Sequence, residues 1–119
     1  MVWQVLFDAD FYEEFLELEV AVQDEIAALT ELLALMGPAL RRPLADTLNG
    51  SHYANMRELR FNASDGVWRL AYAFDPERAA ILLVAGDKSG TAQKLFYKRL
   101  IDKADRRFAA HLAQIKRKD

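Results

Sequence analysis

One arginine stands on a predicted strand among small side chains, where packing alone gives no reason for a large polar group. Side chains alternate between the two faces of a strand, so in residues 67–74 Arg69 shares its face with Val67 and two alanines. We expect these small neighbours to leave the guanidinium uncovered. A planar, permanently charged group of donors suits a phosphate or the charge that develops during phosphoryl transfer. The alternative is an ordinary ion pair with Glu58 on the adjacent strand.

Other cations lie close to Arg69 in the sequence. Arg57 and Arg60 belong to the preceding strand, where their odd spacing puts them on opposite faces. At most one of them can therefore join Arg69 directly. Lys88 follows the strand predicted at about 79–87, and a lysine on such a strand-end loop can reach over the surface of a sheet.

The last predicted helix opens with a tyrosine among basic side chains. Tyr97 is a candidate stacking platform for a base, or a proton-transfer group. The alternative is that it is half-buried packing. The basic residues around it are Lys94, Lys98 and Arg99.

The two histidines offer little metal chemistry. His52 follows a turn sequence before the second strand and is the candidate general base near neutral pH, with a solvated loop histidine as the alternative. His111, in the last helix, is interpreted as structural. Neither has a second ligand at zinc spacing, and the chain has no cysteine. The phosphate-binding glycine loops and the serine-hydrolase elbow are also missing, so we expect no metal and no cofactor.

Hydrophobic periodicity predicts the elements that would position these residues. The pattern indicates an α+β domain with the order β-α-α-β-β-β-α, in which an antiparallel sheet packs against two N-terminal helices and a C-terminal helix. Short turn-rich links make the last three strands successive antiparallel neighbours. The predicted segments are strand 2–7, helices to residue 36 with a break near Glu19–Val20, a connection 39–53, strands at about 54–62, 67–75 and 79–87, and a helix from Thr91 or Gln93 onward.

Composition favours one folded domain over residues 1–119, because 52% of the 119 residues are hydrophobic. No signal peptide or membrane-length apolar run is present, which favours the cytoplasm and argues against a membrane partner. The net charge of −2 hides a separation of charge. Residues 1–40 contain nine acids and no Lys or Arg, so the rest of the chain carries all 16 basic residues against nine acids. Such asymmetry is typical of a surface that meets a polyanion, or of an acidic helix that precedes a basic one.

Four blocks of the sequence resemble the HigB-like, phage-derived branch of the RelE/ParE superfamily of toxins. Together they run over roughly residues 37–108 in the order of that family. They are GPALRRPLADTLNGS at 37–51, NMRELR at 55–60, WRLAYAFDP at 68–76, and LLVAGDK at 82–88 with FY at 96–97 and ADR at 104–106.

The resemblance implies a RelE-like fold and a metal-independent, ribosome-dependent endoribonuclease that cuts messenger RNA. It also implies a cognate helix-turn-helix antitoxin, with the ribosome and messenger RNA as further partners. In such toxins the 2′-hydroxyl of the RNA attacks the adjacent phosphate, which requires a proton acceptor, a proton donor and cations around the phosphorane.

The resemblance also assigns roles to particular residues. Arg69 would stabilise the transition state, with Lys88 and Tyr97 as further catalytic groups. His52 is only a candidate base. The residues expected to bind RNA are Arg57, Arg60, Lys94, Lys98 and Arg99.

Two other functions fit the same fold. One is a ParE-like protein that inhibits DNA gyrase and cleaves nothing. The other is a degenerate, non-toxic binding module.

Overall fold

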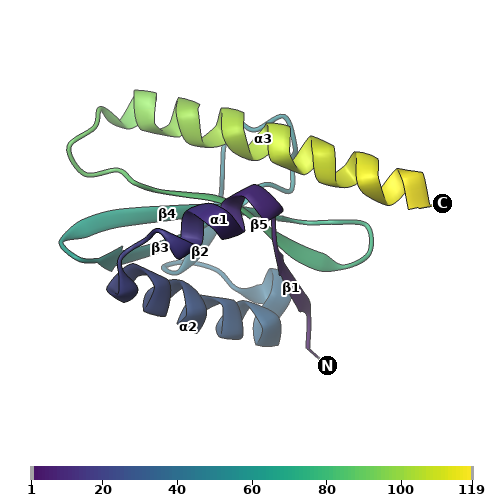
Figure 1. Cartoon of the computed structure of the whole chain (residues 1–119), viewed down its shortest axis with the longest axis horizontal. Coiled ribbons are helices and arrows are strands. Elements are labelled where there is room, and N and C mark those ends of the chain that lie inside the picture. The colour runs from purple at the N-terminus through teal and green to yellow at the C-terminus, as the bar shows by residue number, and fades with distance from the viewer. Residues whose placement is uncertain (1, 119) are drawn as a thin grey trace.

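The computed structural model describes residues 2–118 and has three layers, with α3 on one face of a sheet and α1 and α2 on the other (Figure 1). The elements are β1 (Gln4–Phe7), α1 (Ala9–Leu16), α2 (Val20–Met36), the 3-10 turn η1 (Gly37–Ala39), β2 (Ala45–Thr47), β3 (Arg57–Ala63), β4 (Gly66–Phe74), β5 (Ala79–Asp87) and α3 (Gln93–Lys118). The predicted α+β class and order of elements are confirmed. The short strand β2 lies in a segment that the sequence analysis predicts as a connection.

The sheet is mixed, which corrects the expectation of an antiparallel one. Its strand order is β1-β5-β4-β3-β2. The strands β3, β4 and β5 form the predicted antiparallel series. In contrast, β1 pairs in parallel with β5, from Gln4 opposite Ala79 to Phe7 opposite Leu82. The two helices after β1 cross one face of the sheet, and the chain re-enters it at β2 on the opposite edge, so β1 is paired with the last strand in the sequence.

Each face of the sheet buries its own hydrophobic core. Leu70 and Tyr72 of β4 point to the α1–α2 side, where they join Ile26 and Leu33. Ala71 and Ala73 point to the other side and pack under α3. Because alanine side chains are short, they allow the backbone of a helix to approach a sheet closely.

Two turns follow the local sequence. Ser64 and Asp65 both have positive φ angles, 48° and 61°, as the tight two-residue hairpin between β3 and β4 requires. Gly37 ends α2 with φ 54° and ψ −134°, a conformation that favours glycine. Its N–H donates to the Leu33 carbonyl. The predicted stop at Gly37 is thereby confirmed.

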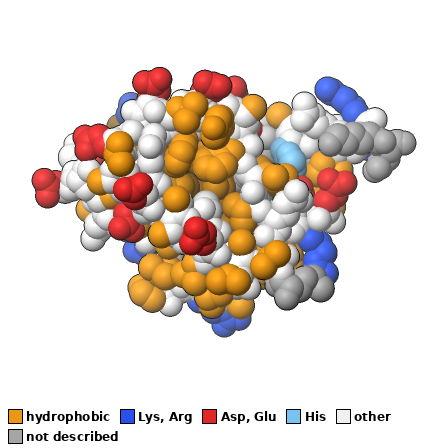
Figure 2. All heavy atoms as spheres, turned by 60° about the horizontal axis from the view of Figure 1, so that its bottom comes forward, with side chains coloured by type: hydrophobic (Ala, Val, Ile, Leu, Met, Phe, Trp, Pro, Cys, Tyr) orange, Lys and Arg blue, Asp and Glu red, His pale blue; other side chains and the backbone are white. Residues whose placement is uncertain are grey.

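The two outer layers differ in charge. Figure 2 looks toward the α2 side, where acidic side chains lie among exposed apolar ones and Lys and Arg occur only at the margins. The basic residues of α3 belong to the opposite face of the sheet. Within residues 2–118, none of the helices combines the length and apolar character that a membrane crossing demands.

Candidate functional site

Arg69 is covered, and the expectation of an exposed guanidinium is wrong. The residue is 5% exposed. Its Nε donates to the Tyr97 hydroxyl at 3.2 Å, and its Nη1 donates to the Trp68 carbonyl at 2.9 Å. The small residues on its strand face are the reason, because they make room for α3, which brings Tyr97 over the guanidinium. The hydrogen bonds of residues 2–118 leave Nη2 of Arg69 without a protein acceptor.

A buried carboxylate completes a group of three with Arg69 and Tyr97. Glu58 is 6% exposed, and its Oε1 lies 3.7 Å from Arg69 Nε, so the ion pair named as the alternative is present. Tyr97 donates its hydroxyl proton to the same oxygen at 3.0 Å. Burial raises the pKa of Glu58, and the hydrogen bond from Tyr97 and the charge of Arg69 oppose that shift. Burial also raises the pKa of Tyr97.

An arginine-lined hollow of about 350 Å³ lies on the other side of Arg69. Arg60, which is paired with Arg69 in the register of β3 and β4, contributes one wall. Arg42 contributes another, and Asp46 lies 2.8 Å from Arg42 and 3.8 Å from Arg60. The hydrogen bond from Arg42 is the main cause of the lowered pKa of Asp46. The remaining lining residues are Pro43, Phe61 and Asn62.

Arg57 does not join this group. Its Nη2 donates to the Leu40 carbonyl at 2.9 Å and its Nε to the Tyr72 hydroxyl at 3.3 Å, both on the α2 face. The prediction that at most one of Arg57 and Arg60 meets Arg69 is confirmed. Arg60 is the one.

The other predicted site residues are dispersed. Lys88 is half-buried on the loop after β5, Lys94 is exposed in the first turn of α3, and Lys98 pairs with Asp102 at 3.1 Å. His52 is exposed, and its backbone N–H donates to Asp105 at 2.8 Å. Asp105 lies eight residues beyond Tyr97, or about 12 Å along the helix. His52 is therefore not brought together with Arg69.

Two members of the site were missed as functional candidates. Arg42 lies in the segment predicted as a connection, and only the unpredicted strand β2 brings it beside Arg60. From the sequence, Glu58 is predicted only as an ion-pair partner of Arg69. The strand pattern alone does not predict that Glu58 is buried, because the residues that cover it belong to α3, which is distant in the sequence.

Comparison with known proteins identifies the family. Residues 13–109 match the model of the phage-derived Gp49-like proteins. The chain belongs to this family. Two similar proteins of Mycobacterium tuberculosis, HigB2 and HigB3, are both named as putative toxins. HigB2 is 46% identical over 75% of this chain, which spans 44% of the HigB2 length. HigB3 is 44% identical over 76% of this chain and 80% of its own length.

Solved structures show that this Gp49-like chain has the RelE fold. A free mutant form of the Escherichia coli toxin RelE superposes with a TM-score of 0.62 at 16% identity, covering 87% of this chain and 97% of that one. A chain of the archaeal RelE–RelB complex from Pyrococcus horikoshii gives a TM-score of 0.55 at 15% identity, covering 76% and 100%.

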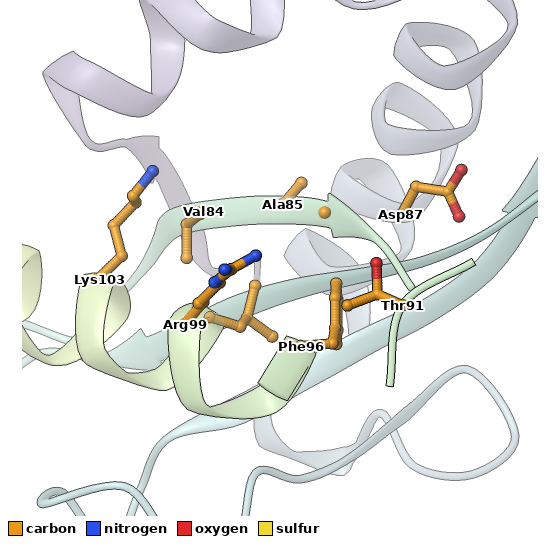
Figure 3. A pocket seen from close by; sticks show the side chains of 9 residues that line it. Val84, Ala85, Asp87, Thr91, Phe96, Arg99 and Lys103 are labelled. Atoms are coloured by element: carbon orange, nitrogen blue, oxygen red, sulfur yellow. The ribbon is translucent and has the colours of Figure 1, made fainter. Parts of the chain in front are cut away.

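A second hollow of the Gp49-like chain lies between β5 and α3, with a volume of about 240 Å³ (Figure 3). Arg99 and Lys103 of α3 line it together with residues 84–87 of β5. Arg99 therefore lies on a different flank of α3 from Tyr97. Over residues 2–118, no three His, Cys, Asp or Glu side chains come together as a metal site would require.

Proposed function

We propose that this chain is the toxin of a type II toxin–antitoxin system and cuts messenger RNA on the ribosome without a metal. The names of HigB2 and HigB3 and the RelE fold support the toxin assignment. One observation carries the chemistry. The Tyr97 hydroxyl lies within hydrogen-bond distance of both the Glu58 carboxylate and the Arg69 guanidinium, and Arg69 also lines the arginine-lined hollow.

Cleavage through the 2′-hydroxyl has definite requirements. The hydroxyl loses a proton, its oxygen bonds to phosphorus, and the bond from phosphorus to the 5′ oxygen breaks. The products are a 2′,3′-cyclic phosphate and a 5′-hydroxyl that has gained a proton. Correct placement, a proton acceptor, a proton donor and fixed positive charge lower this barrier.

The arginines would hold the phosphate. In this proposal the scissile phosphate occupies the arginine-lined hollow, with Arg42 and Arg60 at its walls. Nη2 of Arg69 donates to a phosphate oxygen and stabilises the phosphorane. Asp46, which pairs with both Arg42 and Arg60 in the RNA-free protein, gives way to the phosphate as their partner.

Glu58 and Tyr97 would move the proton. Tyr97 accepts the proton of the 2′-hydroxyl while it passes its own to Glu58, whose raised pKa makes it a better acceptor near neutral pH. Lys88, whose backbone N–H donates to the Val67 carbonyl two residues before Arg69, is the cation that we propose to protonate the 5′ oxygen. Lys94 at the start of α3 lies outside the hollow and would contact only flanking phosphates. Arg57 has no part in this site, because its guanidinium is engaged on the opposite face.

The test is controlled expression in a bacterium, with the 5′ ends of messenger RNA mapped by primer extension. We expect cleavage within translated frames, reduced about 100-fold by Arg69→Ala and by Tyr97→Phe. Lys116→Ala, exposed near the end of α3, is the matched control and should cleave like the wild type. Circular dichroism establishes that each variant is folded.

Other outcomes separate the competing functions. Intact messenger RNA with DNA breaks and filamentous cells would favour gyrase inhibition. Unaffected growth would favour a non-toxic binding module. The expected antitoxin is a helix-turn-helix protein encoded beside this chain, and its co-expression should restore growth.

A further inference from the structure

The register of the sheet places Lys88 beside Arg69. Gly86 of β5 is paired with Arg69 of β4, and two residues further on the Lys88 N–H donates to the Val67 carbonyl at 2.8 Å. Because side chains alternate along a strand, Lys88 belongs to the same face of the sheet as Arg69. Diagonal neighbours on one face are about 7–8 Å apart, within reach of a long side chain. The distance from Lys88 to Arg69 therefore depends on how the backbone at residue 88 is held.

The carboxylate of Asp87 holds this part of the backbone. Its Oδ1 accepts from the Val67 N–H at 3.1 Å and from the Ser89 N–H at 2.9 Å, and it also accepts from the Ser89 hydroxyl. The hydrogen bond from that hydroxyl is the largest cause of the lowered pKa of Asp87. Asp87 thus fixes both Val67, the backbone partner of Lys88, and Ser89, the residue that follows it.

The Asp87 side chain lies on the other face of the sheet from Arg69. Its register partner on β4 is Trp68, which neighbours Arg69 in the chain and so points the opposite way. Figure 3 shows the Asp87 carboxylate on the side of β5 away from Phe96 of α3. A direct contact between Asp87 and RNA bound beside Arg69 is therefore ruled out, because the sheet separates them.

Gly66 provides the space that this carboxylate occupies. A Cβ at residue 66 would lie 2.6 Å from Oδ2 of Asp87 and 2.8 Å from Nε1 of Trp68. That indole nitrogen is buried and, within residues 2–118, has no hydrogen-bond acceptor. Both distances are too short for real contacts, so an alanine at residue 66 would displace the carboxylate. The φ of Gly66 is not positive, and the substitution would act through these contacts rather than through backbone strain.

We propose that Asp87 is a positioning residue that keeps Lys88 where it can protonate the 5′ oxygen during cleavage. The inference rests on the proposed function, in which the Lys88 ammonium gives its proton to that oxygen as the bond to phosphorus breaks. A proton donor is effective only within hydrogen-bond reach of the leaving oxygen, and a displacement of about 1 Å can cost about 100-fold in rate. The effect of Asp87 on the reaction passes through the backbone of residues 88 and 89.

The experiment measures cleavage of messenger RNA on purified ribosomes by the full chain, at several ribosome concentrations. Asp87→Ala should lower the maximal rate about tenfold and leave the half-saturating ribosome concentration nearly unchanged, because Lys88 acts on the breaking bond. Asp87→Asn should recover most of the rate, since an amide oxygen still accepts these hydrogen bonds. Gly66→Ala, which displaces the carboxylate without removing it, should resemble Asp87→Ala.

The matched control is Asp24→Ala, which removes an exposed carboxylate from α2 and should cleave like the wild type. Circular dichroism establishes that each variant is folded. A wild-type rate for Asp87→Ala, or an Asp87→Asn variant as slow as Asp87→Ala, would overturn the inference.

A Lys88→Ala background distinguishes positioning from a general loss of structure. If Asp87 acts through Lys88, Asp87→Ala should cause no further loss of rate once Lys88 is removed. A tenfold loss that persists in this background would show that Asp87 acts elsewhere, and the inference would be wrong while the proposed function stands. If the wild-type chain leaves messenger RNA intact, the proposed function fails and this inference fails with it.

Amide hydrogen exchange gives a readout that needs no activity. The amide of residue 88 is protected in the wild type by its hydrogen bond to the Val67 carbonyl. Its exchange should become faster in Asp87→Ala and stay unchanged in Asp24→Ala. Equal exchange rates in Asp87→Ala and the wild type would show that Asp87 does not hold this backbone, which would also overturn the inference.

Discussion

At Glu58, burial and neighbouring cations shift the pKa of the carboxylate in opposite directions. The net result is a raised pKa, so the folded protein favours the protonated form more than the unfolded chain does. The resulting stabilisation is fully present below the ordinary pKa of 4.5 and is lost as the pH rises through the folded value. At neutral pH the ionised carboxylate therefore lowers the free energy of unfolding.

We expect Glu58→Gln to remove this pH dependence, because glutamine keeps the shape of the side chain without its charge. In urea unfolding at pH 4 and pH 7, the variant should gain stability relative to the wild type at the higher pH. If the difference in free energy of unfolding between the variant and the wild type is the same at both pH values, the pKa of Glu58 is not raised. The same variant should lose RNA cleavage in the proposed mechanism, since an amide at this position accepts no proton.

Gly37 is a position where both backbone and space exclude a side chain. Its φ is positive, and a Cβ there would overlap the indole ring of Trp3. That ring has little freedom to move, because it packs edge-on against Phe74 and beneath the Arg78 guanidinium.

We predict that Gly37→Ala lowers the free energy of unfolding by about 3 kcal/mol, from backbone strain and overpacking together. Gly90→Ala is the control, because Gly90 also has a positive φ but nothing within 4 Å of an added Cβ. It should lose only about 1 kcal/mol. Equal losses in chemical denaturation would show that Trp3 moves aside freely.

For Arg69, the sequence predicts the face of the sheet on which the side chain lies but not its burial. Alternation along β4 placed Arg69 correctly on the face opposite to Leu70 and Tyr72, since parity is a local property. Its burial depended on α3, and a helix that packs on small residues leaves no signal at the arginine itself. The same alanines that suggested an open face, Ala71 and Ala73, are the ones that let the helix close it.

At the scale of elements, Arg107 ties α3 to α1 across the edge of the sheet. Its side chain is 12% exposed and binds Glu14, with Asp8 at 3.7 Å. The hydrogen bond from Arg107 is the largest cause of the lowered pKa of Glu14. A lowered pKa stabilises the fold above the ordinary value of 4.5, and this contribution is lost as the pH falls through the folded value.

A double-mutant cycle of Arg107→Ala and Glu14→Gln should give a coupling of about 1 kcal/mol at pH 7. The coupling should decline in acid, because protonation of Glu14 removes the negative charge that Arg107 binds. The exposed pair of Lys98 and Asp102 on one face of α3 serves for comparison and should give about 0.3 kcal/mol. Thermal or urea unfolding of the variants measures both coupling energies. If the coupling between Arg107 and Glu14 is no larger than that between Lys98 and Asp102, the Arg107 ion pair does not stabilise the packing of α3 on α1.

The elements also differ in how far local sequence determines them. The helix ends at Gly37 and Glu19 and the hairpin at Ser64–Asp65 follow from residues beside them in the chain, and they were predictable. The three residues of β2 have no alternating hydrophobic pattern and become a strand only by pairing with β3. The place of β1 beside β5 depends on residues more than 70 positions away, which no local pattern reports.

For the whole molecule, the separation of acidic and basic residues becomes two oppositely charged layers. The arginine-lined hollow and the cations nearest to it would bind ribosomal RNA, whereas Lys116 near the far end of α3 would contribute little. We predict that the affinity for ribosomes falls steeply between about 50 and 200 mM salt, as expected when cations displace condensed counterions. A double variant, Arg42→Ala with Arg60→Ala, should flatten this dependence in sedimentation assays, whereas Lys116→Ala should flatten it less. A salt-independent affinity would argue against this mode of binding.

Opposite charge on the two outer layers also makes the molecule a strong electric dipole. Its behaviour on ion-exchange media should then depart from its net charge, because a dipolar protein can orient toward a charged matrix. At pH 7 the chain carries a formal charge of −2, yet it should be retained by heparin through its α3 side and by an anion exchanger through its α2 side. The same orientation would turn the molecule, as it approaches a ribosome, so that the basic layer arrives first.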